Sequence, residues 1–127
     1  MFYSNNVKTD VEYSLDKELR NQIICVRDIC ERKFINSDIL LFGSIAKGKY
    51  KNYSDIDILI LINDDISISE LRKLRHELED SIDELKLNRD VDIKLYNKLR
   101  YIELTKDVSF EQAIVNDLIS LRGWKCG

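Results

Sequence analysis

The segment Ser54-Asp-Ile-Asp-Ile-Leu-Ile-Leu-Ile62 decides the fold class of this chain. Its β-branched and apolar side chains predict a buried strand over residues 54–62. The two acids in it, Asp55 and Asp57, are two positions apart, so their carboxylates project from one face of the strand. Their Cα atoms would lie about 6.5 Å apart. We therefore take a rigid strand with paired acids on one face as the centre of the predicted structure.

Other strands are predicted on both sides of this segment. Asp38 precedes an apolar run, Ile-Leu-Leu-Phe, that stops at Gly43, which indicates a buried strand over residues 38–42. Residues 90–96 alternate between polar and apolar side chains, which is typical of a strand with one buried face. A short edge strand is expected at residues 118–122.

Apolar residues at spacings of three and four predict helices between and around the strands. Ser14 is the expected N-cap of the first helix, and Ser67 or Ser69 that of the second. The expected helices cover residues 15–34, 71–85, 97–105 and 109–117.

Length and composition indicate one domain. The chain has 127 residues, of which 44% are hydrophobic and 34% charged, and it contains no proline that could mark a linker. We expect a single domain over residues 1–127, with a core at about 15–122 and a polar lead-in at 1–12. The order of elements predicts an α/β (α+β) fold, in which a small mixed β-sheet is flanked by helices.

The charge balance disfavours two classes of partner. Twenty Lys and Arg residues against 23 Asp and Glu residues give a net charge of −3, whereas nucleic-acid and membrane-surface proteins usually need a basic footprint. No apolar run approaches the ~20 residues of a membrane span. Cys25, Cys30 and Cys126 include no CxxC pair, and we expect reduced thiols in a cytoplasmic protein.

The acids on the strands predict a metal site. Like charges on one face of an apolar strand resist burial, so a cation is their natural compensation, and carboxylate oxygens suit Mg²⁺. Asp92 would face the same site if its strand lies beside that of Asp55 and Asp57. Asp90 shares the face of Asp92, and the pattern leaves the choice between them open. The alternative is that these acids only line a solvated sheet edge.

A Gly-Ser turn lies just upstream of the acids. Gly43 permits close approach of the backbone, and Ser44 begins a turn whose N–H groups could bind a phosphate. Such a turn alone is weak evidence for function. Together with acids at a fixed distance, it predicts a site for polyphosphate and metal.

These residues resemble a known signature. Gly43-Ser44, a gap of ten residues over Ile45–Ser54, and then Asp55-Ile-Asp57 are similar to the motif of the minimal nucleotidyltransferases in the DNA polymerase beta superfamily. Asp92 matches the third carboxylate of that family. Lys47 stands where relatives frequently carry Arg, which keeps the charge but removes a bidentate fork.

The resemblance covers roughly residues 15–122 and implies the nucleotidyltransferase fold. It also implies the transfer of a nucleoside monophosphate, here AMP from ATP, to a hydroxyl group with release of pyrophosphate. Two Mg²⁺ ions would assist, with metal-binding and catalytic roles for Asp55, Asp57 and Asp92. The residues expected to hold the triphosphate are Gly43, Ser44, Lys47 and Ser54.

The resemblance also suggests a partner. Small stand-alone relatives pair with a HEPN-type ribonuclease toxin and adenylylate one of its tyrosines, which implies an antitoxin that forms a hetero-oligomer with its toxin. Two alternatives stay open. The chain could modify a small molecule such as an aminoglycoside, or it could inhibit a toxin by binding alone.

Some remaining residues are assigned to surface or core. His76 lies away from the apolar stripe and is expected on the surface. Cys25 and Cys30 are expected to pack in the core. The leucines of 71–85 are also expected in the core, and Trp124 either packs the last segment down or contacts a partner.

Overall fold

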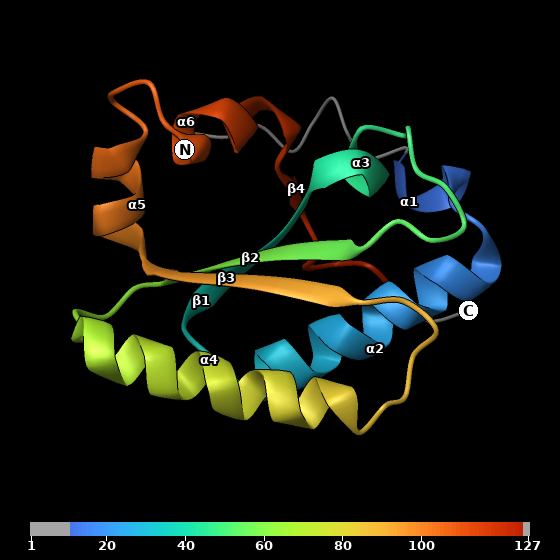
Figure 1. Ribbon diagram of the computed structural model, residues 1–127, viewed down its shortest axis with the longest axis horizontal. Helices are drawn as coiled ribbons and strands as arrows, with labels where there is room; N and C mark the ends of the chain where they lie inside the picture. Colours follow the sequence, from blue (N-terminus) through green and yellow to red (C-terminus); the bar gives the residue numbers. More distant parts are fainter. Residues whose placement is uncertain (1–10, 126–127) are drawn as a thin grey trace.

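The computed structural model describes residues 11–125 as a four-stranded mixed sheet with helices on both faces (Figure 1). This confirms the α/β class and the small mixed sheet expected from the sequence. In chain order the elements are α1 (Val11–Ser14), α2 (Lys17–Lys33), β1 (Ser37–Phe42), α3 (Gly43–Ala46), β2 (Ile56–Ile62), α4 (Ile68–Asp83), β3 (Val91–Asn97), α5 (Lys98–Leu104), α6 (Phe110–Ile114), the 3₁₀ helix η2 (Val115–Asp117) and β4 (Ile119–Ser120).

The strands lie in the order β3-β2-β1-β4, so β3 and β4 form the edges. β1 pairs antiparallel with both β2 and β4, whereas β2 and β3 pair in parallel. A parallel pair needs a crossover connection, and α4 supplies it. The pairing sets Asp57 opposite Asp92 on one side and opposite Phe42 on the other.

The two faces of the sheet carry separate apolar clusters. On one face, the alternating Ile56, Ile58 and Ile60 are fully buried in a cluster with side chains of α2 and α4. On the other face, Leu59 and Leu61 pack with side chains of α5, α6 and the segment after them. Figure 1 shows α2 and α4 on one side of the sheet and α3, α5 and α6 on the other. Asp57 belongs to the second face, because it alternates with the buried isoleucines.

The start of α2 corrects one prediction. Ser14 is not its N-cap; it ends α1, and its Oγ donates a hydrogen bond to the carbonyl oxygen of Val11 at 2.8 Å. Asp16 occupies the N-cap position without a side-chain hydrogen bond. The apolar spacing could not distinguish these options, because Leu15 is buried although it lies outside the helix.

The expected polar lead-in is also wrong for the part that can be described. Residues 1–10 lie outside the described range, but Val11 and Glu12 belong to α1, and Glu12 is buried. Nε of Arg20 donates to Oε2 of Glu12 at 3.0 Å. This pairing explains how an acid can leave the solvent at this point of the chain.

The later elements agree more closely with prediction. Ser67 caps α4, since its side chain accepts the N–H of Glu70 at 3.2 Å. Leu78 is fully buried, whereas Leu85 lies beyond the helix end and is 37% exposed, so the predicted stripe leaves the core there. The helix expected at 109–117 is divided into α6 and η2.

The remaining predictions concern whether single residues are buried or exposed. Cys30 is buried as expected, but Cys25 is exposed, because it lies on the solvent side of α2. Cys126 lies outside the described residues. His76 is exposed and Trp124 is buried. Within residues 11–125, no helix is long and apolar enough to cross a membrane.

Candidate active site

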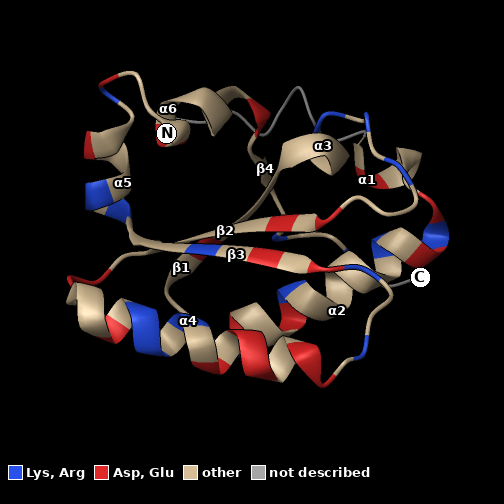
Figure 2. Ribbon diagram, in the orientation of Figure 1, with Lys and Arg blue, Asp and Glu red and all other residues tan. Residues whose placement is uncertain are grey.

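Two acids face each other across the parallel pair of strands. Asp57, on β2, lies opposite Asp92, on β3, and both side chains are partly buried. Asp55 is exposed and immediately precedes β2, so the strand predicted for 54–62 begins two residues later than expected. Figure 2 shows the acidic stretches of β2 and β3 side by side.

The electrostatics of Asp57 show that negative charge gathers here. Burial raises the pKa of Asp57 from 3.8 to about 6, and the charges of Asp92 and Asp55 add to this effect, while Lys94 opposes it. Asp90 is exposed, and its carbonyl oxygen accepts the N–H of Ile56 at 2.9 Å. The acid of the third strand that acts on Asp57 is therefore Asp92.

The Gly-Ser turn packs directly against Asp57. Gly43 has a φ of +80°, a conformation that favours glycine. A Cβ atom on Gly43 would lie only 2.0 Å from Oδ2 of Asp57, so the carboxylate occupies the space that any other side chain would need. Ser44 follows in α3, whose first N–H groups have no partner inside the helix. This arrangement places the first backbone N–H groups of α3 next to a carboxylate.

Two residues predicted to bind phosphate have other partners. Lys47 is exposed at the end of α3, with its Nζ 3.7 Å from Oδ2 of Asp117. The hydroxyl of Ser54 accepts the N–H of Lys51 at 2.8 Å and closes a turn. The structure thus brings Gly43 and Ser44 to the acids, but it engages Lys47 and Ser54 elsewhere.

Lys94 is a residue of this site that sequence reasoning missed. Its Nζ lies 3.6 Å from Oδ1 of Asp92 and 5.9 Å from the ring centre of Phe110. Lys94 follows Asp92 by two positions on a strand, so its place on the same face could have been read from the spacing. Phe110 is 46% exposed and meets Phe42 edge-on, with ring centres 5.8 Å apart.

Arg89 holds the loop that leads into Asp55. One terminal nitrogen, Nη1, donates to the carbonyl oxygens of Lys51 at 3.1 Å and Ser54 at 2.8 Å. These contacts join the loop before β3 to the loop before β2. No local pattern indicates them, because the partners are far apart in the sequence.

The carboxylates have the right chemistry for Mg²⁺, but they do not form a closed ligand set as they stand. Among residues 11–125, no three His, Cys, Asp or Glu side chains are placed so that they could hold a metal ion. The raised pKa of Asp57 shows that the cluster lacks full compensation, which is what a bound cation would provide.

Comparisons with known proteins place the chain in a family and find similar proteins. The model of the family described as "Nucleotidyltransferase domain" matches residues 23–117. A "Putative protein adenylyltransferase" of Methanocaldococcus jannaschii is 35% identical over 74 residues, which make up 58% of this chain and 72% of that protein. Among solved structures, a chain from a "toxin-antitoxin with AMP-PNP" is 26% identical with a TM-score of 0.38, and the match covers 73% of this chain and 69% of that one.

Proposed function

The chain belongs to the nucleotidyltransferase domain family, and from this premise we propose that it transfers AMP from ATP to a hydroxyl group of a partner protein. The family makes the chain a nucleotidyltransferase. The nucleotide, the acceptor and the metal are our proposals. The observation that carries them is the packing of the Gly43-Ser44 turn against Asp57, directly opposite Asp92.

Three acids would hold Mg²⁺. Asp57 and Asp92 face each other on adjacent strands, and Asp55 contributes its charge from the loop beside them. When bound, Mg²⁺ supplies positive charge that stabilises the phosphoryl oxygens and lowers the pKa of a coordinated hydroxyl. Lys94, whose Nζ lies 3.6 Å from Oδ1 of Asp92, would hold a phosphate oxygen at this site.

The remaining groups position the reactants. The N–H groups at the start of α3 and the hydroxyl of Ser44 would hold phosphate oxygens. The acceptor oxygen forms a bond to the α-phosphorus, while the bond from that phosphorus to the bridging oxygen breaks and pyrophosphate leaves with the electron pair. Asp92, on the open edge strand, would accept the proton of the acceptor hydroxyl.

The acceptor we propose is a tyrosine of a HEPN-type ribonuclease toxin, which the chain would neutralise as its antitoxin. The resemblance of the motif supports this, as does the name of the relative from Methanocaldococcus jannaschii, "Putative protein adenylyltransferase". Exposed apolar side chains also suit a protein acceptor. Leu99 is 80%, Val108 96% and Phe110 46% exposed, and all three lie on or between α5 and α6.

The proposal can be tested by weighing the products. The chain is incubated with ATP, MgCl₂ and the product of the adjacent gene, which we propose to be a HEPN-type toxin, and every protein is measured by intact-mass spectrometry. We expect the toxin to gain the mass of AMP with wild type and with Asp64→Asn, an exposed control acid, but not with Asp57→Asn. An unmodified, still active toxin would contradict the proposal. Transfer to a small molecule alone would favour the small-molecule alternative.

A further inference from the structure

An apolar groove opens at the free edge of the sheet. It has a volume of about 540 Å³ and lies between the start of α4, the end of β3 and α5. Leu71, Leu95 and Leu104 contribute apolar side chains to its wall, together with Ile66 and Ile68. Because β3 is an edge strand, no further strand covers this side of the sheet within residues 11–125.

The groove carries positive charge. Arg72, Arg75 and Arg100 line it, against a single acidic lining residue, Asp65. Among the described residues, neither Arg72 nor Arg100 has an ion-pair or hydrogen-bond partner. Nε of Arg75 is buried without a hydrogen-bond partner and lies 4.0 Å from Oε1 of Glu79. The N-terminus of α4 adds further positive potential at this point.

Two hydrogen bonds join the two sides of the groove at Asn97 and Ile66. The side chain of Asn97, at the end of β3, donates to the carbonyl oxygen of Ile66 at 2.7 Å and accepts the N–H of Ile66 at 3.2 Å. This fixes the loop before α4 against the edge strand. A groove that is already formed reduces the ordering cost of binding.

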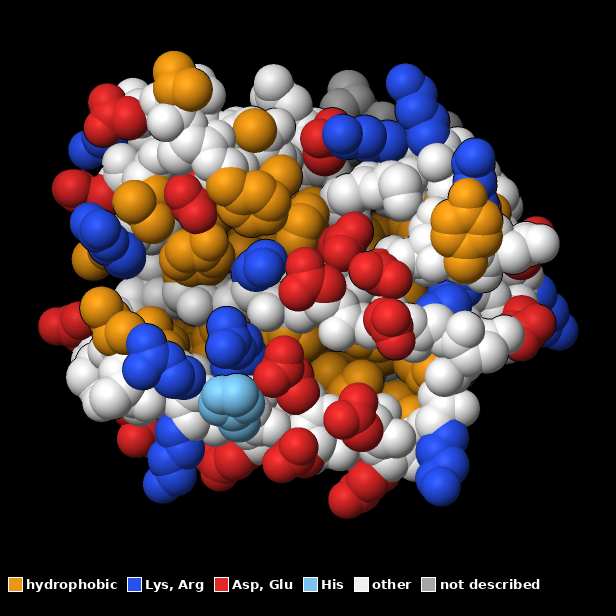
Figure 3. All heavy atoms as spheres, viewed as in Figure 1, with side chains coloured by type: hydrophobic (Ala, Val, Ile, Leu, Met, Phe, Trp, Pro, Cys, Tyr) orange, Lys and Arg blue, Asp and Glu red, His pale blue; other side chains and the backbone are white. Residues whose placement is uncertain are grey.

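The groove and the acids share one strand. Tyr96, which lines the groove, follows Asp92 by four positions and lies on the same face of β3, so the two are about 13 Å apart. Figure 3 shows apolar side chains bordered by blue ones at the left of this surface, and the red cluster at its centre. An extended peptide needs about four residues to span that distance.

We propose that this groove, defined by Arg72, Arg75, Arg100 and the apolar residues between them, docks an acidic-apolar peptide segment of the protein acceptor. The docked segment would place a tyrosine about four residues away beside Asp92. The proposal rests on the proposed transfer to a protein. It defines the class of substrate as proteins whose acceptor hydroxyl lies near a segment of alternating acidic and apolar residues.

A peptide fits this groove better than a small anion. The apolar wall needs apolar side chains, which phosphate and free nucleotides cannot supply along its length. The arginines stand on two different helices, α4 and α5, so a single anion is a poor match for all of them. A chain with several carboxylates can contact them in turn.

The test uses fluorescein-labelled peptides with a Leu-Glu-Leu-Glu anchor and one tyrosine, separated by about two, four or eight neutral residues. Binding is measured by fluorescence anisotropy without ATP. We expect Arg72→Ala combined with Arg100→Ala to raise the Kd at least about tenfold. Lys73→Ala with Lys106→Ala, an equal loss of charge at exposed positions outside the groove, should leave the Kd unchanged.

Adenylylation of the same peptides provides the second readout. With ATP and MgCl₂, the peptide whose tyrosine lies about four residues from the anchor should be adenylylated fastest. The docking site would be refuted if both double variants bound the peptide with the same Kd. It would also be refuted if inorganic phosphate displaced the peptide completely. Arginine-dependent binding without transfer of AMP to any peptide or to the toxin would support the groove and refute the proposed reaction, so the two failures can be told apart.

Discussion

The carboxylate of Asp57 packs so closely against Gly43 that no side chain fits at position 43. The carboxylate of Asp57 lies where a Cβ atom of Gly43 would be, and the φ of +80° at Gly43 favours glycine in its own right. The chain therefore needs glycine here for two independent reasons. Gly48 has a similar φ, +74°, but open space around it.

We expect Gly43→Ala to lower the free energy of unfolding by about 2–4 kcal/mol, because strain in φ and a collision with Asp57 add up. Gly48→Ala, which meets only the strain, should cost about 1 kcal/mol. Urea denaturation measures both. Equal losses in the two variants would mean that the carboxylate moves aside without cost. Asp57→Ala in the Gly43→Ala background should recover part of the difference.

The raised pKa of Asp57 makes stability depend on pH. The unfolded chain releases this proton near the ordinary value of 3.8 and the folded chain near 6, so the folded state binds more protons between these values. The free energy of unfolding therefore falls as pH rises through this window and stays lower above it. Asp57→Asn should be more stable than wild type by about 1–2 kcal/mol at pH 8, and equally stable near pH 4.

Magnesium should act on the same group. At ten times its Kd, Mg²⁺ would add about 1.4 kcal/mol to wild type at pH 8, and EDTA would remove it. Asp57→Asn should show little response, and Asp64→Asn should behave as wild type. Thermal melts at pH 4 and pH 8, with and without MgCl₂, make the measurement. If Mg²⁺ did not change the melting temperature of wild type at pH 8, this would argue against a metal at these acids.

Helices and strands were the level at which the sequence was most informative. The β-branched side chains around Ile58 predict the buried strand, and the local pattern limits the cap of α4 to Ser67 or Ser69, of which Ser67 is the cap. The apolar periodicity misplaced the start of α2 and the solvent-facing Cys25, because neighbouring elements decide which side of a helix is buried. The pattern also predicts Asp55 on the strand. The strand begins only at Ile56, because the preceding residues form a turn that Ser54 closes.

In the candidate site, too, local spacing could be predicted from the sequence, whereas contacts between distant segments could not. The spacing of Gly43, Asp55 and Asp57 was visible, since it lies within one hairpin of the sheet. The contacts of Lys94 with Phe110 and of Arg89 with the loop before Asp55 were not, because they join distant parts of the chain. Which of two acids on the third strand faces Asp57 also depended on the register of the parallel pair.

Arg89 is expected to position Asp55 through the loop it holds. Arg89→Ala should lower the free energy of unfolding by about 1 kcal/mol and raise the Mg²⁺ concentration for half-maximal activity several-fold. Arg89→Lys can still donate to the carbonyl oxygens of Lys51 and Ser54, and it should recover much of this loss. A change in stability alone, with the Mg²⁺ dependence unaltered, would assign Arg89 a purely structural role.

Packing of α4 on the sheet gives a sharper test of the core. Leu78 is fully buried in the cluster of the first face, whereas Leu85 is 37% exposed beyond the helix end. Leu78→Ala should cost about 3 kcal/mol, and Leu85→Ala about 1 kcal/mol or less. Urea denaturation again provides the values. Similar costs would show that the end of α4 is more buried than its exposure indicates.

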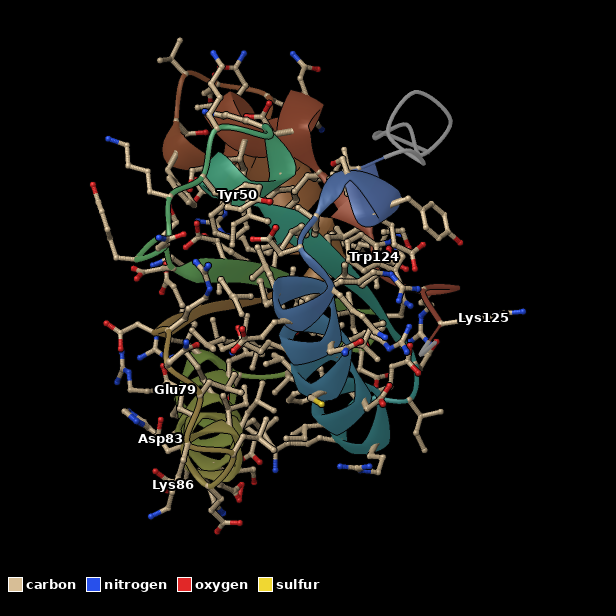
Figure 4. All side chains as sticks on the ribbon, turned by 90° about the vertical axis from the view of Figure 1, so that its right-hand side faces the viewer. Tyr50, Glu79, Asp83, Lys86, Trp124 and Lys125 are labelled. Carbon is tan, nitrogen blue, oxygen red and sulfur yellow. The ribbon has the colours of Figure 1, made fainter. Side chains whose placement is uncertain are left out.

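Helix α2 binds segments near both ends of the described residues 11–125. Arg27 donates through Nη1 to the carbonyl oxygens of Leu121 at 2.8 Å and Trp124 at 2.6 Å, and Arg20 donates to that of Lys125. Figure 4 shows Lys125 extending away from this end of the molecule, while Trp124 lies against it. Residues near both ends of the described chain are thus tied to one helix.

Loss of this closure should affect global stability. Arg27→Ala removes the donor to the carbonyl oxygen of Trp124, whereas the carbonyl oxygen of Leu121 keeps the N–H of Trp124 at 3.2 Å, and the change should cost about 1–3 kcal/mol. Arg32→Ala, at an exposed position of the same helix, should cost about 0.5 kcal/mol or less. Hydrogen exchange should show the segment around Leu121 opening faster in the first variant only. Unchanged exchange there would mean that β4 holds the segment by itself.

The parallel pairing of Asp57 with Asp92 has a consequence for the order of events in folding. The two acids are separated in sequence by a whole helix and meet only when β3 docks in the correct register. A slip by one residue would turn Asp92 into the apolar layer and bring Ile93 to the surface. A ligand that requires both carboxylates can therefore recognise only a finished molecule. It would slow unfolding without speeding folding, so the metal would report on assembly of the sheet rather than guide it.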